Sequence, residues 1–109
     1  MTYKLFIDDE RNPPISWCDE PVKICRSSSE AISCISMHGI PDFISFDHDL
    51  GGEDTAIKVI NWLENSCIEH NLRFSESFEF YVHSQNPVGA ENIQYRMQAL
   101  IKHFSRKNK

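Results

Sequence analysis

The chain has 109 residues, is 40% hydrophobic and 25% charged, and carries a formal net charge of −5. These values are typical of one globular domain, so we expect residues 1–109 to form a single domain. The acidic balance argues against an extended nucleic-acid surface, and because no membrane span or signal peptide is recognisable, we expect a cytoplasmic protein.

Four apolar stretches have the length and residue types of β-strands. They cover residues 3–7, 22–25, 42–47 and 78–82. Between the first two lies Asn12-Pro13-Pro14, which excludes a regular helix because proline lacks a backbone N–H and restricts the residue before it.

Helical stretches separate the later strands and follow the last one. Ser27 and Glu30 form a capping-box pattern that predicts the start of the first helix. Asp54 can cap the second helix, and the third begins at one of two residues, Asn86 or Gly89.

The alternation of strands with helices predicts an α/β fold with a parallel sheet that is covered on both faces. We expect the strand order 2-1-3-4, which makes the first and third strands neighbours. Ligands of such sheets bind beyond the carboxyl ends of the strands, so residues that follow the strands are the candidates for a site.

Acidic residues gather at this edge of the predicted sheet. The polar residues that directly follow three strands are Asp8 and Asp9, then Asp47, His48 and Asp49, then His83 and Ser84. Carboxylates this close repel one another unless a cation is bound, and oxygen ligands favour a hard ion. We therefore expect Asp8, Asp9 and Asp47 to hold Mg²⁺ or Mn²⁺; the alternative is that each acid only caps a loop or a helix.

Two histidines and the start of the last helix add groups for proton transfer and anion binding to the same edge of the sheet. His48 and His83 titrate near neutral pH and suit proton transfer, although a lone histidine is often only a hydrogen-bonded structural residue. Ser84, Asn86 and the amides that open the last helix form an arrangement that attracts anions. A metal ion, an imidazole and an anion-binding helix start together indicate phosphoryl chemistry.

Three motifs resemble those of the cyclic-phosphate-processing receiver domains, which are related to the receiver domains of response regulators. The motifs are "FIDDERNP" (6–13), "SFDHDLGG" (45–52) and "VHSQNPVGAENI" (82–93). The resemblance implies a flavodoxin-like three-layer sandwich and a phosphoesterase acting on cyclic phosphate ends, such as the 2′,3′-cyclic phosphate of RNA or of a nucleotide. Unlike in ordinary receivers, we expect no fifth strand after the last helix, and therefore not the lysine that this strand carries.

The predicted mechanism assigns a role to each candidate residue. The expected catalytic residues are Asp47, His48, Asp49 and His83, and the expected phosphate-binding residues are Arg11, Ser84 and Asn86. Asp49 or His48 takes a proton from the attacking water, and His83 protonates the leaving ribose oxygen. In a second enzymatic route Asp47 is the nucleophile and Asp49 the acid–base group.

A non-enzymatic alternative has the same residues. In it the protein is a degenerate receiver that binds a protein or an RNA and catalyses nothing, and the acidic edge holds a structural ion or a phosphorylated end. The expected partner is an RNA end or a nucleotide with a cyclic phosphate, and no protein partner is indicated.

Overall fold

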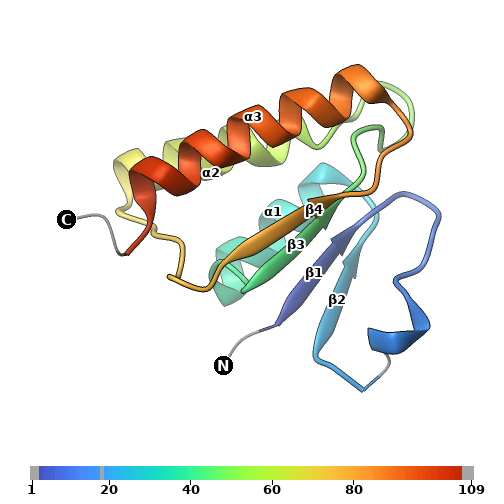
Figure 1. Ribbon diagram of the computed structural model, residues 1–109, viewed down its shortest axis with the longest axis horizontal. Helices are drawn as coiled ribbons and strands as arrows, with labels where there is room; N and C mark the ends of the chain where they lie inside the picture. Colours follow the sequence, from blue (N-terminus) through green and yellow to red (C-terminus); the bar gives the residue numbers. More distant parts are fainter. Residues whose placement is uncertain (1–2, 18, 107–109) are drawn as a thin grey trace.

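The computed structural model describes residues 3–17 and 19–106. Its elements are β1 (Lys4–Ile7), η1 (Ile15–Trp17), β2 (Val22–Cys25), α1 (Ser28–His38), β3 (Phe43–Phe46), α2 (Ile57–Glu69), β4 (Glu79–Val82) and α3 (Pro87–Phe104). The four strands form one parallel sheet in the order β2-β1-β3-β4 (Figure 1). The predicted strand order and the flavodoxin-like class are therefore confirmed.

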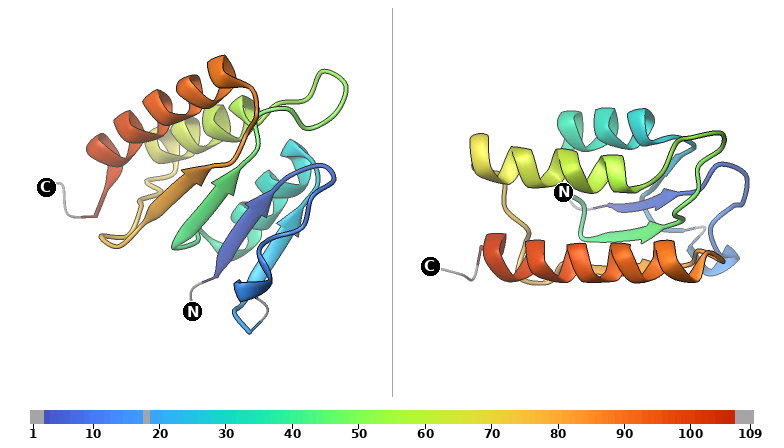
Figure 2. Two further views of the ribbon diagram at one scale, coloured as in Figure 1. Left: turned by 45° about the vertical axis from the view of Figure 1, so that its right-hand side comes forward. Right: turned by 90° about the horizontal axis from the view of Figure 1, so that it is seen from above.

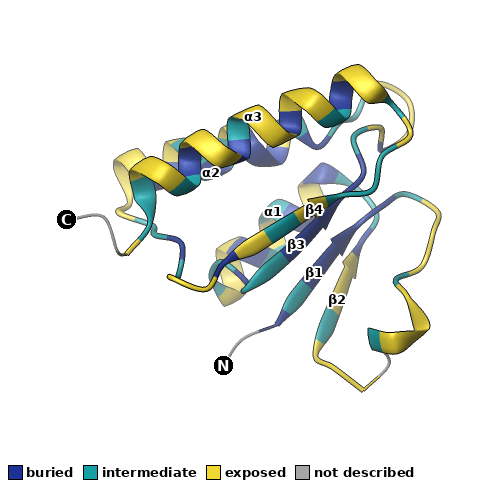
Figure 3. Ribbon diagram, in the orientation of Figure 1, coloured by how far each residue is buried: buried dark blue, intermediate teal, exposed yellow. Residues whose placement is uncertain are grey.

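One face of the sheet packs on the helices and forms the core. Leu5 and Ile7 of β1 and Ile44 and Phe46 of β3 are fully buried there. The three helices contribute apolar side chains to the same core, and Figure 2 shows α1 and α2 side by side over the strands. Burial is concentrated in the central strands β1 and β3, while β2 and β4 expose part of their residues as edge strands (Figure 3).

The opposite face of the sheet is covered in part by the loop that joins β1 to β2. Trp17 of η1 packs edge-on against Phe6 and Phe43, with ring centroids 6.1 and 5.6 Å away. The ammonium of Lys4 lies 4.7 Å from the centroid of the Trp17 ring. A loop with a short 3-10 helix thus takes the place of a regular helix, as the two prolines in this segment predict.

The starts of α1 and α3 follow the sequence pattern. The Ser27 hydroxyl accepts a hydrogen bond from the Glu30 amide at 3.1 Å and caps α1. Asn86 caps α3, because its side-chain oxygen accepts from the Gly89 amide at 3.0 Å. Of the two predicted starts of the last helix, Asn86 is therefore correct.

The predicted role of Asp54 is wrong. Ala56 is the N-cap of α2 and makes no side-chain capping bond, whereas the Asp54 carboxylate accepts from the Ser28 amide at 2.8 Å and from the Ser28 hydroxyl at 2.5 Å. A tight turn, with the Asp54 amide bonded to the Gly51 carbonyl, directs this carboxylate toward α1. Asp54 thus ties the loop after β3 to the start of a different helix.

Among the described residues, no helix combines the length and the apolar character that are needed to cross a membrane.

Candidate functional site

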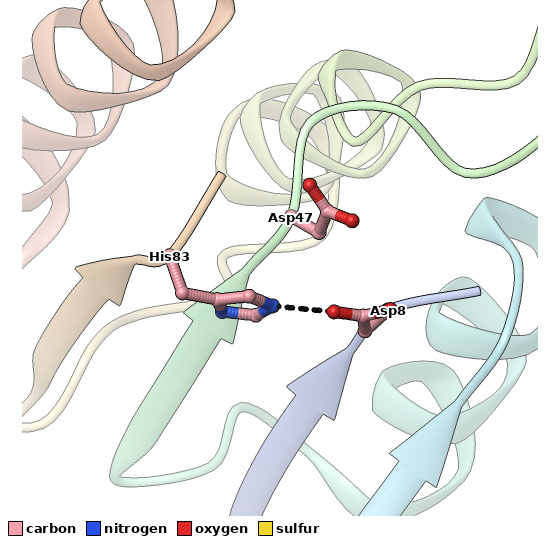
Figure 4. Close-up of side chains that lie close together, drawn as sticks. All are labelled: Asp8, Asp47 and His83. Atoms are coloured by element: carbon pink, nitrogen blue, oxygen red, sulfur yellow. Dashed lines mark hydrogen bonds and ion pairs between the residues drawn. The ribbon is translucent and has the colours of Figure 1, made fainter. Parts of the chain in front are cut away.

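The strand register brings Asp8, Asp47 and His83 together at the carboxyl edge of the sheet. Two positions before them in the chain, the residues paired across β1, β3 and β4 are Phe6, Ser45 and Tyr81. Side chains alternate along a strand, so the residues two positions later lie on the same face. The amides of Asp47 and His83 still bond to the neighbouring strands at 2.9 Å, which extends the ladder to the site. Figure 4 shows His83 and Asp8 pointing toward each other, with the side chain of Asp47 close to both.

Asp8 is fully buried and accepts hydrogen bonds at both oxygens. Its Oδ1 accepts from the amides of Glu10 and Arg11 at 2.9 and 2.8 Å, and its Oδ2 accepts from Arg11 Nε at 3.0 Å and His83 Nε2 at 2.9 Å. Burial alone would raise the pKa of Asp8, but the two amides, the imidazole and the Arg11 guanidinium outweigh it and lower the pKa. Asp8 is therefore an ionised acceptor at neutral pH.

Both ring nitrogens of His83 are engaged. Nε2 lies 2.9 Å from Asp8 Oδ2, and Nδ1 lies 2.7 Å from the Ser45 hydroxyl (Figure 4 shows the first contact). Because an ionised carboxylate only accepts, Nε2 carries the proton, and in a neutral ring Nδ1 accepts from Ser45. The ring also stacks on Phe6, with centroids 4.7 Å apart and planes 4° from parallel. As a general acid, His83 would first have to exchange one of these two bonds.

The group formed by Asp8, Asp47 and His83 could hold a metal ion, since one ligand atom from each lies within 4.8 Å of the others. Two carboxylates and one imidazole are a donor set that divalent metals accept. The sequence prediction had Asp9 where this group has His83; Asp9 lies one residue beyond the strand register and lines a neighbouring cavity.

Arg11 joins the two carboxylates of this group. Its Nε is 3.0 Å from Asp8 Oδ2 and its Nη2 is 3.5 Å from Asp47 Oδ2, while 46% of its side chain stays exposed. The loop that carries Arg11 is held by Arg26, which donates to the carbonyls of Asp8 and Arg11 and, at 2.7 Å, to Asn12 Oδ1. The guanidinium thus offsets one of the two negative charges of a pair of acids that face each other across β1 and β3.

A polar cavity of about 660 Å³ opens beside this group. It is lined by Asp9, Glu10, Arg11, Asp47, Asp49, Gly51, Gly52, Ser84, Gln85 and Asn86. All three predicted phosphate-binding residues are among them. Asp8 and His83 are not, so Asp47 is the residue that the buried group shares with the cavity. The lining holds four carboxylates and one guanidinium, an excess of negative charge that disfavours an anionic ligand unless a further cation is present.

His48 and Asp49 belong to a loop that contacts the start of α3. Asp49 Oδ1 lies 3.0 Å from His48 Nδ1, and Asp49 Oδ2 accepts from the Asn86 amide group at 3.2 Å. Both bonds lower the pKa of Asp49, and the bond to His48 has the larger effect. The His48 ring lies against Gly89, where a Cβ would come within 2.7 Å of Nδ1. The loop therefore presents Asp49 to the cavity, and His48 packs against the helix.

The sequence interpretation missed two residues of this site. Ser45 was not singled out, although it is the only polar residue of the strand "FISF" and lies two positions before Asp47. Arg26 directly follows β2 at the edge where the site lies, and a cation at that place is the signal that could have identified it.

Comparison with known proteins gives a family match. Residues 3–99 match the family described as cyclic-phosphate processing receiver domain. A search of curated proteins and a search of solved structures each gave no match. The matched range contains every residue of the buried group and of the cavity lining.

Proposed function

The chain belongs to the family of cyclic-phosphate processing receiver domains, and we propose that it is a metal-dependent phosphoesterase that opens cyclic phosphate ends of RNA or of nucleotides. The observation that carries the proposal is the position of Asp47. This residue belongs both to the buried group that could hold a metal ion and to a polar cavity with hydrogen-bonding groups on its other side. A phosphate in that cavity would lie next to the proposed ion.

The residues of the cavity have distinct tasks in this proposal. Arg11, Ser84 and Asn86 bind the phosphate oxygens from two sides. Asp49 is exposed and ionised at neutral pH, and it accepts the proton of the attacking water, although its lowered pKa makes it a weaker base than an ordinary aspartate. His83 carries its proton on Nε2, so it can protonate the leaving oxygen only after it gives up Asp8, and its first task is to hold Asp8 in place.

Asp8 and Asp47 would hold the ion, and Asp9 of the cavity lining is a further candidate ligand. His83 would join them only in the tautomer with the proton on Nδ1, since a protonated Nε2 donates to Asp8 and cannot bind a metal ion. A bound Mg²⁺ or Mn²⁺ would offset the negative charge of the lining, polarise the phosphate and lower the pKa of a nearby water molecule. The excess of carboxylates in the cavity supports the requirement for such an ion.

The test uses an RNA oligonucleotide that ends in a 2′,3′-cyclic phosphate, incubated with the protein in Mg²⁺ or in a chelator and followed by end-group analysis. We expect monoester ends only with Mg²⁺, and a loss of about 10²-fold or more for Asp47→Asn. Asp19→Asn, an exposed aspartate outside the site, is the charge-matched control. Cyclic ends that persist under all conditions would refute the proposal.

The rival function is binding without turnover, by a receiver-like module that recognises a protein or an RNA end. Two observations favour it: no histidine is among the described residues that line the cavity, and both ring nitrogens of the neighbouring His83 are engaged in hydrogen bonds. Retention of the intact cyclic end by the protein, measured as binding without product, would select this function.

Phosphodonors provide a separate test against a signalling role. Among the described residues that line the cavity, Arg11 is the only cationic one, and it already contacts Asp47. We expect acetyl phosphate to give no lasting acyl-phosphate on Asp47, as measured by mass spectrometry. A stable phosphorylated Asp47 with untouched cyclic ends would make the protein a signalling module.

A further inference from the structure

The guanidinium of Arg11 contacts the same carboxylates that a divalent ion would have to bind. It contacts Asp8 Oδ2 at 3.0 Å and Asp47 Oδ2 at 3.5 Å, the two carboxylates of the group that could hold a metal ion. A carboxylate oxygen has few acceptor positions, and Asp8 already uses both oxygens for four donors. A second cation can therefore bind this pair only if an existing donor leaves.

We propose that Arg11 is a displaceable counter-ion. Its guanidinium offsets one of the two negative charges of Asp8 and Asp47 while no divalent ion is bound, and it releases both carboxylates when an ion binds. This inference rests on the metal site of the proposed function, and not on turnover. It predicts that the arginine and the ion compete for the same oxygens, so that removing the guanidinium strengthens the binding of the ion.

Arg11 is the donor best suited to leave. Its side chain is 46% exposed, whereas the His83 side chain is 14% exposed and is fixed by Ser45 and by stacking on Phe6. The contact to Asp47 is also long for a charge-assisted hydrogen bond. The energy that holds a half-exposed guanidinium in place is thus smaller than that of the buried imidazole.

The Arg11 backbone would stay in place during this exchange. Its amide donates to Asp8 Oδ1 at 2.8 Å, and its carbonyl accepts from Arg26. Only side-chain torsions need to change, and the guanidinium already borders the cavity. Once released, Arg11 can bind an anion in the cavity. Binding of the metal ion to the buried group would therefore also free the Arg11 guanidinium to bind the phosphate.

The first experiment measures Mg²⁺ and Mn²⁺ binding by calorimetry for the wild type, Arg11→Gln and Arg11→Lys. We expect Arg11→Gln to bind at least about tenfold tighter than the wild type, because the ion no longer competes with a charged donor. Arg11→Lys keeps the charge without the two-pronged contact and should lie between them. Equal or weaker binding by Arg11→Gln, or no binding by any form, would overturn the proposal.

Arg96→Gln is the matched control, since it removes the same charge from a residue that pairs with Glu64 and Asn61 away from the site. Its ion affinity should equal that of the wild type. If it tightened binding as much as Arg11→Gln, the effect would be one of net charge and the proposal would fail.

A second measurement keeps the test valid if Arg11→Gln is unstable. In the folded wild type, the Nε–H resonance of Arg11 should shift when Mg²⁺ is added, and that of Arg96 should not. An unmoved Arg11 resonance at saturating Mg²⁺ would refute displacement. Tighter binding by Arg11→Gln together with cyclic ends that stay intact would instead support this inference and refute the proposed phosphoesterase activity.

Discussion

The site has two halves that differ in how the chain positions them. One half consists of Asp8, Asp47 and His83, which extend three adjacent strands in register and are largely buried. The other half consists of loop residues, such as Asp9 and Asp49, which line an open cavity. Strand register fixes the first half, and side-chain contacts within loops fix the second.

The two halves also differ in hydrogen bonding. In the described residues, no buried side-chain nitrogen or oxygen lacks a partner, and Asp8 alone accepts four hydrogen bonds. Asp49, in contrast, keeps 63% of its side chain exposed. The buried half is therefore suited to holding charges in a fixed geometry, and the exposed half to meeting a ligand.

The sharpest test of this difference replaces each of two neighbouring aspartates, one from each half, by asparagine in separate variants. Asp8→Asn places an amide group against the donors of Arg11 and His83, and we expect it to lower the free energy of unfolding by about 3 kcal/mol. Asp9→Asn, one residue further on, should change it by no more than about 0.5 kcal/mol. Denaturation in urea measures both. Equal losses would mean that the two halves do not differ in their contribution to stability.

A second test concerns the contact between the loop after β3 and α3. Glycine to alanine within a helix normally stabilises a protein by up to about 1 kcal/mol. Gly89→Ala should instead destabilise it by about 2 kcal/mol, because the new Cβ would lie 2.6 Å from His48 Cδ2 and 2.7 Å from Nδ1.

The control for this test is the double variant His48→Ala with Gly89→Ala. It removes the clash and should recover most of the stability that the single variant loses. If Gly89→Ala alone were stabilising, His48 would not pack against the helix, and its role as a proton acceptor in the cavity would have to be considered again.

Much of the buried half could be predicted from sequence. Strands have a side-chain period of two, and polar residues directly after apolar strands reach one edge of a parallel sheet, which placed Asp8, Asp47 and His83 together. The alternation of side chains along a strand could not predict which hydrogen-bond partner each polar atom has. The hydrogen bond from Ser45 to His83 joins residues 38 positions apart, and it changes what the imidazole can do.

The loop half was less predictable, because loop conformation depends on contacts that no local pattern encodes. Asp54 has the residue type and position of a helix cap, yet a turn that begins at Gly51 directs it to Ser28. Arg26 acts on a loop that precedes it in the chain, through carbonyl oxygens that every residue type possesses. Such contacts become visible only when the chain is folded.

The smallest expected effect tests how the loop half is anchored. Burial would raise the pKa of Asp54, but its hydrogen bonds from Ser28 and the charge of Lys58 lower it below the usual value. A carboxyl with a lower pKa in the folded state stabilises the fold above its unfolded pKa of about 3.9, and this stabilisation is lost as the pH falls through the folded pKa.

Asp54→Asn should therefore cost about 1 kcal/mol at pH 7, and the difference from the wild type should shrink as the pH drops below about 4. Urea denaturation of both proteins between pH 7 and pH 3 measures this, and hydrogen exchange of the Ser28 amide locates it. A cost that stays constant with pH would show that the charge of Asp54 is not what anchors the loop. If the protection were lost at the start of α2 and not at Ser28, the loop would instead be fixed by the helix that follows it.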